Sequence, residues 1–68
     1  MTPQEMLQDM IDDAWKEYNL SLAEEENDPD NAMISIERSF AEGYAEALSV
    51  AHFLIFDEQY TSAGSNVN

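Results

Sequence analysis

Apolar side chains recur every three or four residues in the first third of the chain. The repeat consists of Leu7, Ile11, Ala14, Trp15, Tyr18 and Leu22. Residues at this spacing fall on one side of an α-helix, and the intervening positions are mostly polar. The pattern therefore predicts a helix over about residues 3–24 that turns this stripe toward a core.

Two helix starts are visible in the sequence. Thr2, Pro3 and Glu5 form a capping box with proline at the first helical position. Asp28 and Pro29 repeat this arrangement, so we expect Asp28 to cap a second helix over about residues 29–59. The glutamates at 24–26 oppose the dipole at the end of the first helix, which we therefore expect to fray into the connection.

The second helix carries its own apolar stripe, which we expect to face the first. Its members are Met33, Ile36, Phe40, Tyr44, Ala47, Ala51 and Leu54. Two amphipathic helices joined by a short connection form an antiparallel hairpin, so the fold class is all-α, with one domain over residues 1–60. Gly43 favours a close helix approach. The polar tail, residues 61–68, is predicted to be disordered.

The second helix has more apolar surface than one stripe uses. At 100° per residue, Phe53 and Phe56 lie away from the stripe, and Leu48 and Ile55 widen one flank. A hairpin cannot cover both sides of a helix, so these four residues are candidate anchors for a dimer or a partner. We expect a homodimer that forms a four-helix bundle. The alternative is that the helix ends earlier and Phe56 folds back onto the core.

The strongly acidic net charge of the chain excludes some classes of function. The 68 residues include 15 acids and 2 basic side chains, for a net charge of −13. This balance argues against direct binding to nucleic acid or anionic membranes.

The chain has no cysteine and no long apolar run, and we expect no signal peptide and a cytoplasmic location. A chain this short buries only about 60% of its unfolded surface, which again favours a second subunit.

The strongest candidate site is an acidic face on the first helix. It consists of Glu5, Asp9, Asp12, Asp13 and Glu17. These five acids span about 18 Å of helix, or about one charge per 3.6 Å. A strand of duplex DNA carries a phosphate about every 3.4 Å along the axis. The face therefore predicts a mimic of nucleic acid, and its alternative is an ordinary solvated helix surface.

The connection offers a weaker candidate, a calcium site. Glu26, Asp28, Asp30 and Glu37 occupy positions 1, 3, 5 and 12 of an EF-hand-like register. Asn31 stands where the loop requires glycine, and Pro29 suits a helix start better. A plain capped helix start is the favoured interpretation, and we expect no metal or other cofactor.

Nothing in the sequence supports catalysis. His52, the single histidine, lacks the Glu-x-x-His spacing of metal-binding bundles, and we expect it to be a partly exposed flank residue. Glu42 and Glu46 have no accompanying nucleophile. We therefore expect a non-enzyme.

The sequence favours a small acidic binding protein whose partner is a basic, nucleic-acid-binding protein that it inhibits. In size and composition the chain resembles the short acidic helical accessory proteins of phages and other mobile elements. The alternative is a structural or assembly module, a homodimeric bundle whose acidity serves only solubility.

Overall fold

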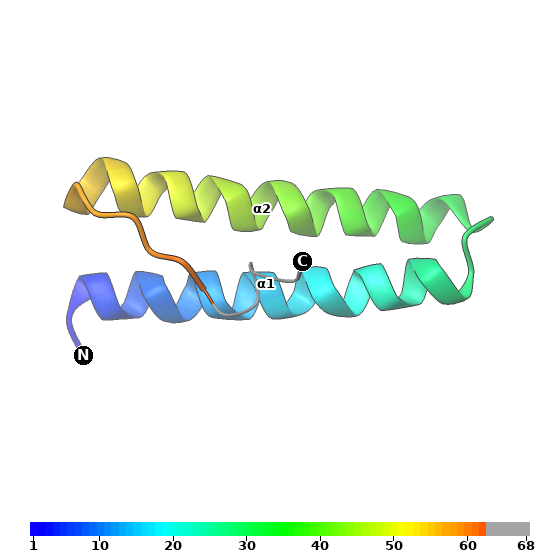
Figure 1. Cartoon of the computed structure of the whole chain (residues 1–68), viewed down its shortest axis with the longest axis horizontal. Coiled ribbons are helices and arrows are strands. Elements are labelled where there is room, and N and C mark those ends of the chain that lie inside the picture. The colour runs from blue at the N-terminus through cyan, green and yellow to red at the C-terminus, as the bar shows by residue number, and fades with distance from the viewer. Residues whose placement is uncertain (63–68) are drawn as a thin grey trace.

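The computed structural model describes residues 1–62, and this part of the chain is all-helical, with two helices packed against each other and no strand. Helix α1 spans Pro3–Asn27 and helix α2 spans Ala32–Phe56. The helices run antiparallel, and the segment after α2 turns back across the pair toward α1 (Figure 1). The predicted hairpin is confirmed.

The start of α1 follows the sequence prediction. Thr2 accepts a hydrogen bond from the backbone N–H of Glu5, and the Glu5 carboxylate accepts one from the backbone N–H of Thr2. The capping box and the proline at the first position are therefore both present. They set where α1 begins and so fix the register of its apolar stripe.

The connection is shifted from its predicted place. Helix α1 continues through the three glutamates to Asn27, and Asp28 ends it by donating its N–H to the carbonyls of Glu24 and Glu25. Helix α2 begins three residues later than predicted, because Asn31 caps it by accepting from the N–H of Met33. Asp28 instead accepts from the Asn31 amide at 3.2 Å. The second helix start was therefore assigned to the wrong cap.

The stripe of α1 packs as predicted. Ile11 is fully buried and Ala14 is 4% exposed. Leu7, Trp15, Tyr18 and Leu22 are half-buried around them. The rings of Trp15 and Tyr18 meet edge to face, with centroids 5.5 Å apart. This face of α1 forms one half of the core.

The stripe predicted for α2 does not face α1, which corrects the sequence analysis. Met33, Ile36, Phe40, Tyr44 and Leu54 are all more than half exposed, with Phe40 and Leu54 at 74%. The covered positions of α2 lie on its opposite side and include Ile34, Arg38, Ala41, Ala45, Leu48, Ser49, His52 and Phe56. Ala45 and His52 are completely buried.

The buried side of α2 is the more polar one, and its residues suit an enclosed position. Ala45 is small and fully buried there, and the polar groups on this side have partners. Ser49 donates to the carbonyl of Ala45, and Arg38 pairs with Glu25 across the helices. Gly43 has no neighbouring atom within 4 Å of the place a Cβ would occupy, so it does not mediate the contact within the hairpin.

The segment after α2 crosses back over the helices. Asp57 ends α2 in a left-handed conformation, with φ of 52°, and donates its N–H to the carbonyl of Phe53. Tyr60 is half-buried and Ser62 is 2% exposed. Part of the predicted disordered tail, Thr61 and Ser62, is thus described, and residues 63–68 lie outside the described part.

Candidate functional site

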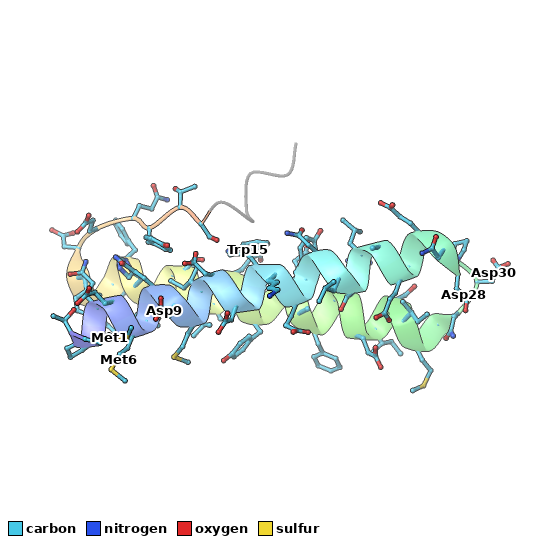
Figure 2. The ribbon with its side chains drawn as sticks, turned by 90° about the horizontal axis from the view of Figure 1, so that it is seen from below. Met1, Met6, Asp9, Trp15, Asp28 and Asp30 are labelled. Carbon is cyan, nitrogen blue, oxygen red and sulfur yellow. The ribbon has the colours of Figure 1, made fainter. Side chains whose placement is uncertain are left out.

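The five acids of the acidic face are all exposed on α1. Asp9 points away from α2, and Met6 projects to the side of the hairpin opposite the C-terminal segment (Figure 2). Because α1 is continuous from Pro3 to Asn27, these acids are held on one regular helix. Glu5 and Glu17 lie twelve residues apart, which is about 18 Å along the axis. The structure therefore presents the predicted line of carboxylates to solvent.

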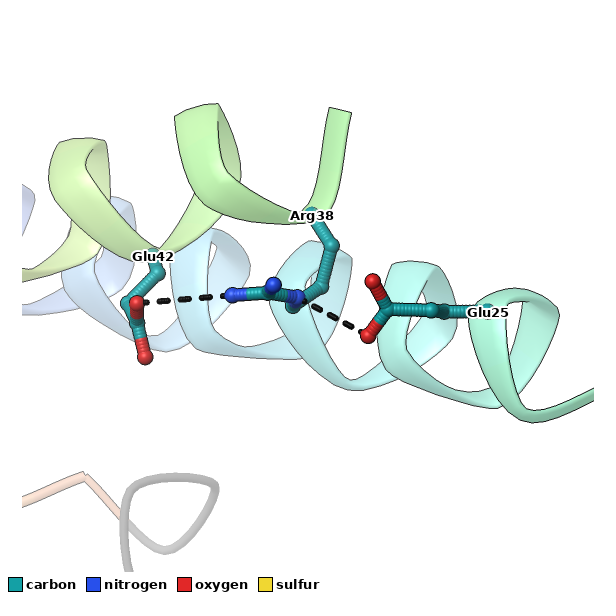
Figure 3. A network of polar contacts seen from close by, with 3 residues as sticks. All are labelled: Glu25, Arg38 and Glu42. Atoms are coloured by element: carbon teal, nitrogen blue, oxygen red, sulfur yellow. Dashed lines mark hydrogen bonds and ion pairs between the residues drawn. The ribbon is translucent and has the colours of Figure 1, made fainter. Parts of the chain in front are cut away.

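Almost no positive charge opposes this face. Lys16 is its one cation, and within residues 1–62 no ion pair involves it. Arg38, the only other basic side chain, lies on α2 between Glu25 and Glu42 (Figure 3). Its Nε atom is 3.0 Å from Glu25 and its guanidinium is 3.7 Å from Glu42. Arg38 therefore links the helices near the connection and leaves the acidic face uncompensated.

Two members of the acidic face also have structural contacts. Hydrogen bonds from the backbone and side chain of Thr2 lower the pKa of Glu5. The Tyr60 hydroxyl donates to both carboxylate oxygens of Asp12, at 3.0 and 2.9 Å. This hydrogen bond and partial burial raise the pKa of Tyr60. A neutral hydroxyl does not cancel the charge of Asp12, so the face keeps its five carboxylates.

The predicted anchor residues do not form one patch. Ile55 is 67% exposed and Phe53 is 49% exposed. Leu48 is half-buried, and Phe56 is half-buried against the ring of His52, with centroids 5.1 Å apart. Phe53 lines a pocket of about 330 Å³ together with Trp15, Val50 and Tyr60. The end of α2 is therefore partly covered by the chain itself.

His52 is the residue that the sequence analysis misjudged most. It was expected on a partly exposed flank, but the structure buries it completely. Its Nδ1 lies 2.7 Å from the Glu58 carbonyl oxygen and its Nε2 lies 3.2 Å from the Gln8 amide nitrogen. Because a carbonyl only accepts, Nδ1 carries the proton, and Nε2 accepts from Gln8. The signal in the sequence was His52 lying seven residues after Ala45 on the same side of α2.

The candidate calcium ligands are not gathered. Within residues 1–62, no three histidine, cysteine or acidic side chains lie close enough together to hold a metal ion. The Asp28 carboxylate is engaged by Asn31, and Glu26 and Glu37 are exposed on different helices. The connection is a capped helix start with two consecutive turn residues, Pro29 and Asp30.

The side chains exposed by the inverted packing of α2 form a second candidate surface. We call it the outer stripe, and it consists of Met33, Ile36, Phe40, Tyr44, Val50 and Leu54. Met10 of α1 lies beside Tyr44, where both line a shallow hollow with Ala14. Sequence reasoning found most of these residues by their spacing but placed them in the core.

The fold and these surfaces define a class of protein: an all-α helical hairpin with one acidic face and one apolar outer stripe. Neither described helix is long and apolar enough to cross a bilayer. Comparisons with protein families, curated proteins and solved structures find no match to this chain.

Proposed function

We propose that this chain is a non-enzymatic binding protein that presents its acidic face to a basic, nucleic-acid-binding protein and competes there with nucleic acid. One observation carries the proposal: five exposed carboxylates lie along one helix face that has a single unpaired cation, Lys16, among the described residues. A basic cleft that binds phosphates through lysine and arginine would meet a similar line of negative charge.

Charge reversal tests this function. We expect Asp9→Lys with Asp13→Lys to abolish capture of basic nucleic-acid-binding proteins from a host lysate. The matched control is Glu26→Lys with Asp30→Lys, which changes the net charge equally at exposed positions near the connection. The control should retain capture, and duplex DNA added to the column should release the captured proteins. Equal loss in both variants would show that only bulk charge matters and would overturn the proposal.

A second candidate function has its own observation. The outer stripe leaves six large apolar side chains exposed on a chain of 68 residues. This supports an assembly module in which two hairpins form a homodimeric four-helix bundle and the acidity serves only solubility. In that case the Asp9→Lys, Asp13→Lys variant should assemble and function as the wild type does. The two functions are thus separated by the same pair of substitutions.

The cellular location that we propose for this protein follows from its proposed partner. The expected site of action is the cytoplasm, where nucleic-acid-binding partners of this kind are available to a protein of phage or mobile-element type. No cofactor is required, because the proposed activity is binding alone.

A further inference from the structure

We infer that the outer stripe is the seam of a two-fold dimer in which α2 packs antiparallel against α2 of a second copy. The inference rests on the proposed homodimer and names its surface, which differs from the anchors predicted around Phe53 and Phe56. Six exposed side chains carry it, together with two small residues, Gly43 and Ala47, that lie among them.

The spacing of the stripe is that of a packed helix pair. Met33, Ile36, Phe40, Gly43, Ala47, Val50 and Leu54 follow one another at alternating intervals of three and four residues. This is the repeat by which two helices interlock side chains along a common seam. No charged residue occupies any of these positions in a chain that carries 15 acids. The repeat therefore has a partner helix outside the hairpin, because α1 packs on the other side of α2.

The exposed area is large enough for a dimer. Eight side chains contribute, the six of the outer stripe and the neighbouring Met6 and Met10, and they are between 46% and 74% exposed. At roughly 200 Å² for a large apolar side chain, they offer roughly 900 Å² in total. A stable interface needs about 800 Å² per partner. The outer stripe together with Met6 and Met10 therefore offers enough apolar surface, and no residue of the acidic face is counted in it.

The distribution of side-chain size along the stripe favours an antiparallel arrangement. The small residues Gly43 and Ala47 lie at its centre and larger residues lie toward both ends. With the two-fold axis at the level of Ala45, Gly43 of one copy faces Ala47 of the other, and Ile36 faces Leu54. Phe40 then meets Val50. In a parallel pair each residue would face its own copy. The two Phe40 side chains would then crowd each other, and a gap would remain between the helices where Gly43 faces Gly43.

A second copy fits this surface better than a basic protein does. An isologous contact presents the same apolar stripe from both sides, so each copy supplies the complement of the other. A basic partner would be drawn to the carboxylates of α1, and the stripe has none. The occupant is therefore a second copy of this chain.

Substitution and sedimentation test the seam. We expect the wild type to sediment as a dimer at micromolar concentration and Phe40→Glu to raise the dissociation constant by more than about tenfold. Leu20→Glu is the matched control, since Leu20 is also exposed but lies on α1 away from the stripe. Circular dichroism should show the same helix content in both variants, because neither side chain is buried.

Cysteine crosslinking gives an independent measurement, because the chain has no cysteine of its own. In the antiparallel pair, two copies of Ala47→Cys lie about 6 Å apart along the axis, whereas two copies of Met33→Cys lie about 36 Å apart. We expect rapid disulfide formation for Ala47→Cys and none for Met33→Cys. Crosslinking of both variants at equal rates would overturn the antiparallel arrangement.

The outcomes separate this inference from the proposed functions. A wild type that stays monomeric overturns both the homodimer and the seam. A wild type that dimerises while Phe40→Glu dimerises equally well overturns the seam alone. Capture of basic proteins is read out separately through Asp9 and Asp13, so failure of the nucleic-acid mimic leaves the seam untouched.

Discussion

The Nδ1 atom of His52 lies 2.7 Å from the carbonyl oxygen of Glu58, and this contact holds the chain after α2 against the helices. The imidazole is enclosed by Phe56 and Tyr60, whose ring centroids are 5.1 and 5.7 Å away. The Gln4 amide of α1 adds a hydrogen bond to the Glu58 carboxylate at 3.2 Å. One buried histidine therefore organises the end of a core that contains few large apolar residues.

Replacing His52 should destabilise the hairpin. His52→Ala removes a buried ring and both of its hydrogen bonds, and we expect a loss of about 2 kcal/mol in the free energy of unfolding. His52→Phe keeps a ring and should lose less. Leu20→Ala, at a half-exposed position, should change stability by less than about 0.5 kcal/mol. Urea denaturation followed by circular dichroism measures all three, and a His52→Ala loss no larger than that of Leu20→Ala would contradict this role.

Alkaline pH should release the C-terminal segment. The pKa of Tyr60 is raised in the folded state by its hydrogen bond to Asp12 and by partial burial. The stabilising contribution of Tyr60 is therefore fully present below its ordinary pKa and is lost as the pH rises through the raised value.

The single tryptophan reports this release. Trp15 and Tyr60 line the same pocket, so Trp15 fluorescence should change as Tyr60 ionises. Tyr60→Phe cannot ionise there and should lack the part of the fluorescence change that follows from release of the segment. An identical alkaline transition in both proteins would exclude Tyr60 as its cause.

The pair of Arg38 and Glu25 should couple the two helices. A hydrogen bond from Ser35 and then the pairing with Arg38 lower the pKa of Glu25. The stabilising contribution of Glu25 is therefore present above the ordinary carboxyl pKa and is lost as the pH falls through the lowered value. We expect the stability difference between wild type and Glu25→Gln to shrink over that range.

A double-mutant cycle isolates this pair. Arg38→Gln and Glu25→Gln should show a favourable coupling, and Arg38→Gln with Glu42→Gln a smaller one, because Glu42 is more distant and more exposed. A coupling energy of zero between Arg38 and Glu25 would contradict a role of this ion pair in holding the two helices together.

Salt should act in opposite directions on the two proposed interactions. Binding of a basic partner to the acidic face weakens as salt rises, because opposite charges are screened. Dimerisation through the outer stripe brings together two chains of net charge −13 and should therefore strengthen as salt rises. Sedimentation and partner capture at low and high ionic strength measure the two effects. A dimer that dissociates in high salt would contradict an apolar seam.

Much of the fold was predictable from local pattern. The capping box at Thr2 and the stripe around Ile11 fixed the start and the buried side of α1, because that helix has only one apolar side. The acidic face was predictable for the same reason, because its acids occupy positions of α1 that point away from the buried stripe. The connection was less predictable, since Asp28 and Asn31 are both good caps and only the extent of α1 decides between them.

For α2, periodicity alone pointed to the wrong side of the helix. The outer stripe around Phe40 is the more apolar, and a rule that buries the most apolar side places it in the core. The structure instead buries Ala45 and His52, and a histidine with two hydrogen-bond partners can be enclosed at little cost. That preference depends on Gln8 and Glu25, which lie on the other helix, and on Glu58, which reaches His52 only once the chain has turned back after α2.

The sequence by itself therefore determined two amphipathic helices, their antiparallel connection and the line of carboxylates on α1. These follow from interactions within a few residues, namely caps and helical periodicity, and from the scarcity of compensating cations. Only the tertiary structure decided which side of α2 faces α1 and which is left for another molecule. The physical reason is that partners for Arg38 and His52 exist only once the two helices and the returning segment are together.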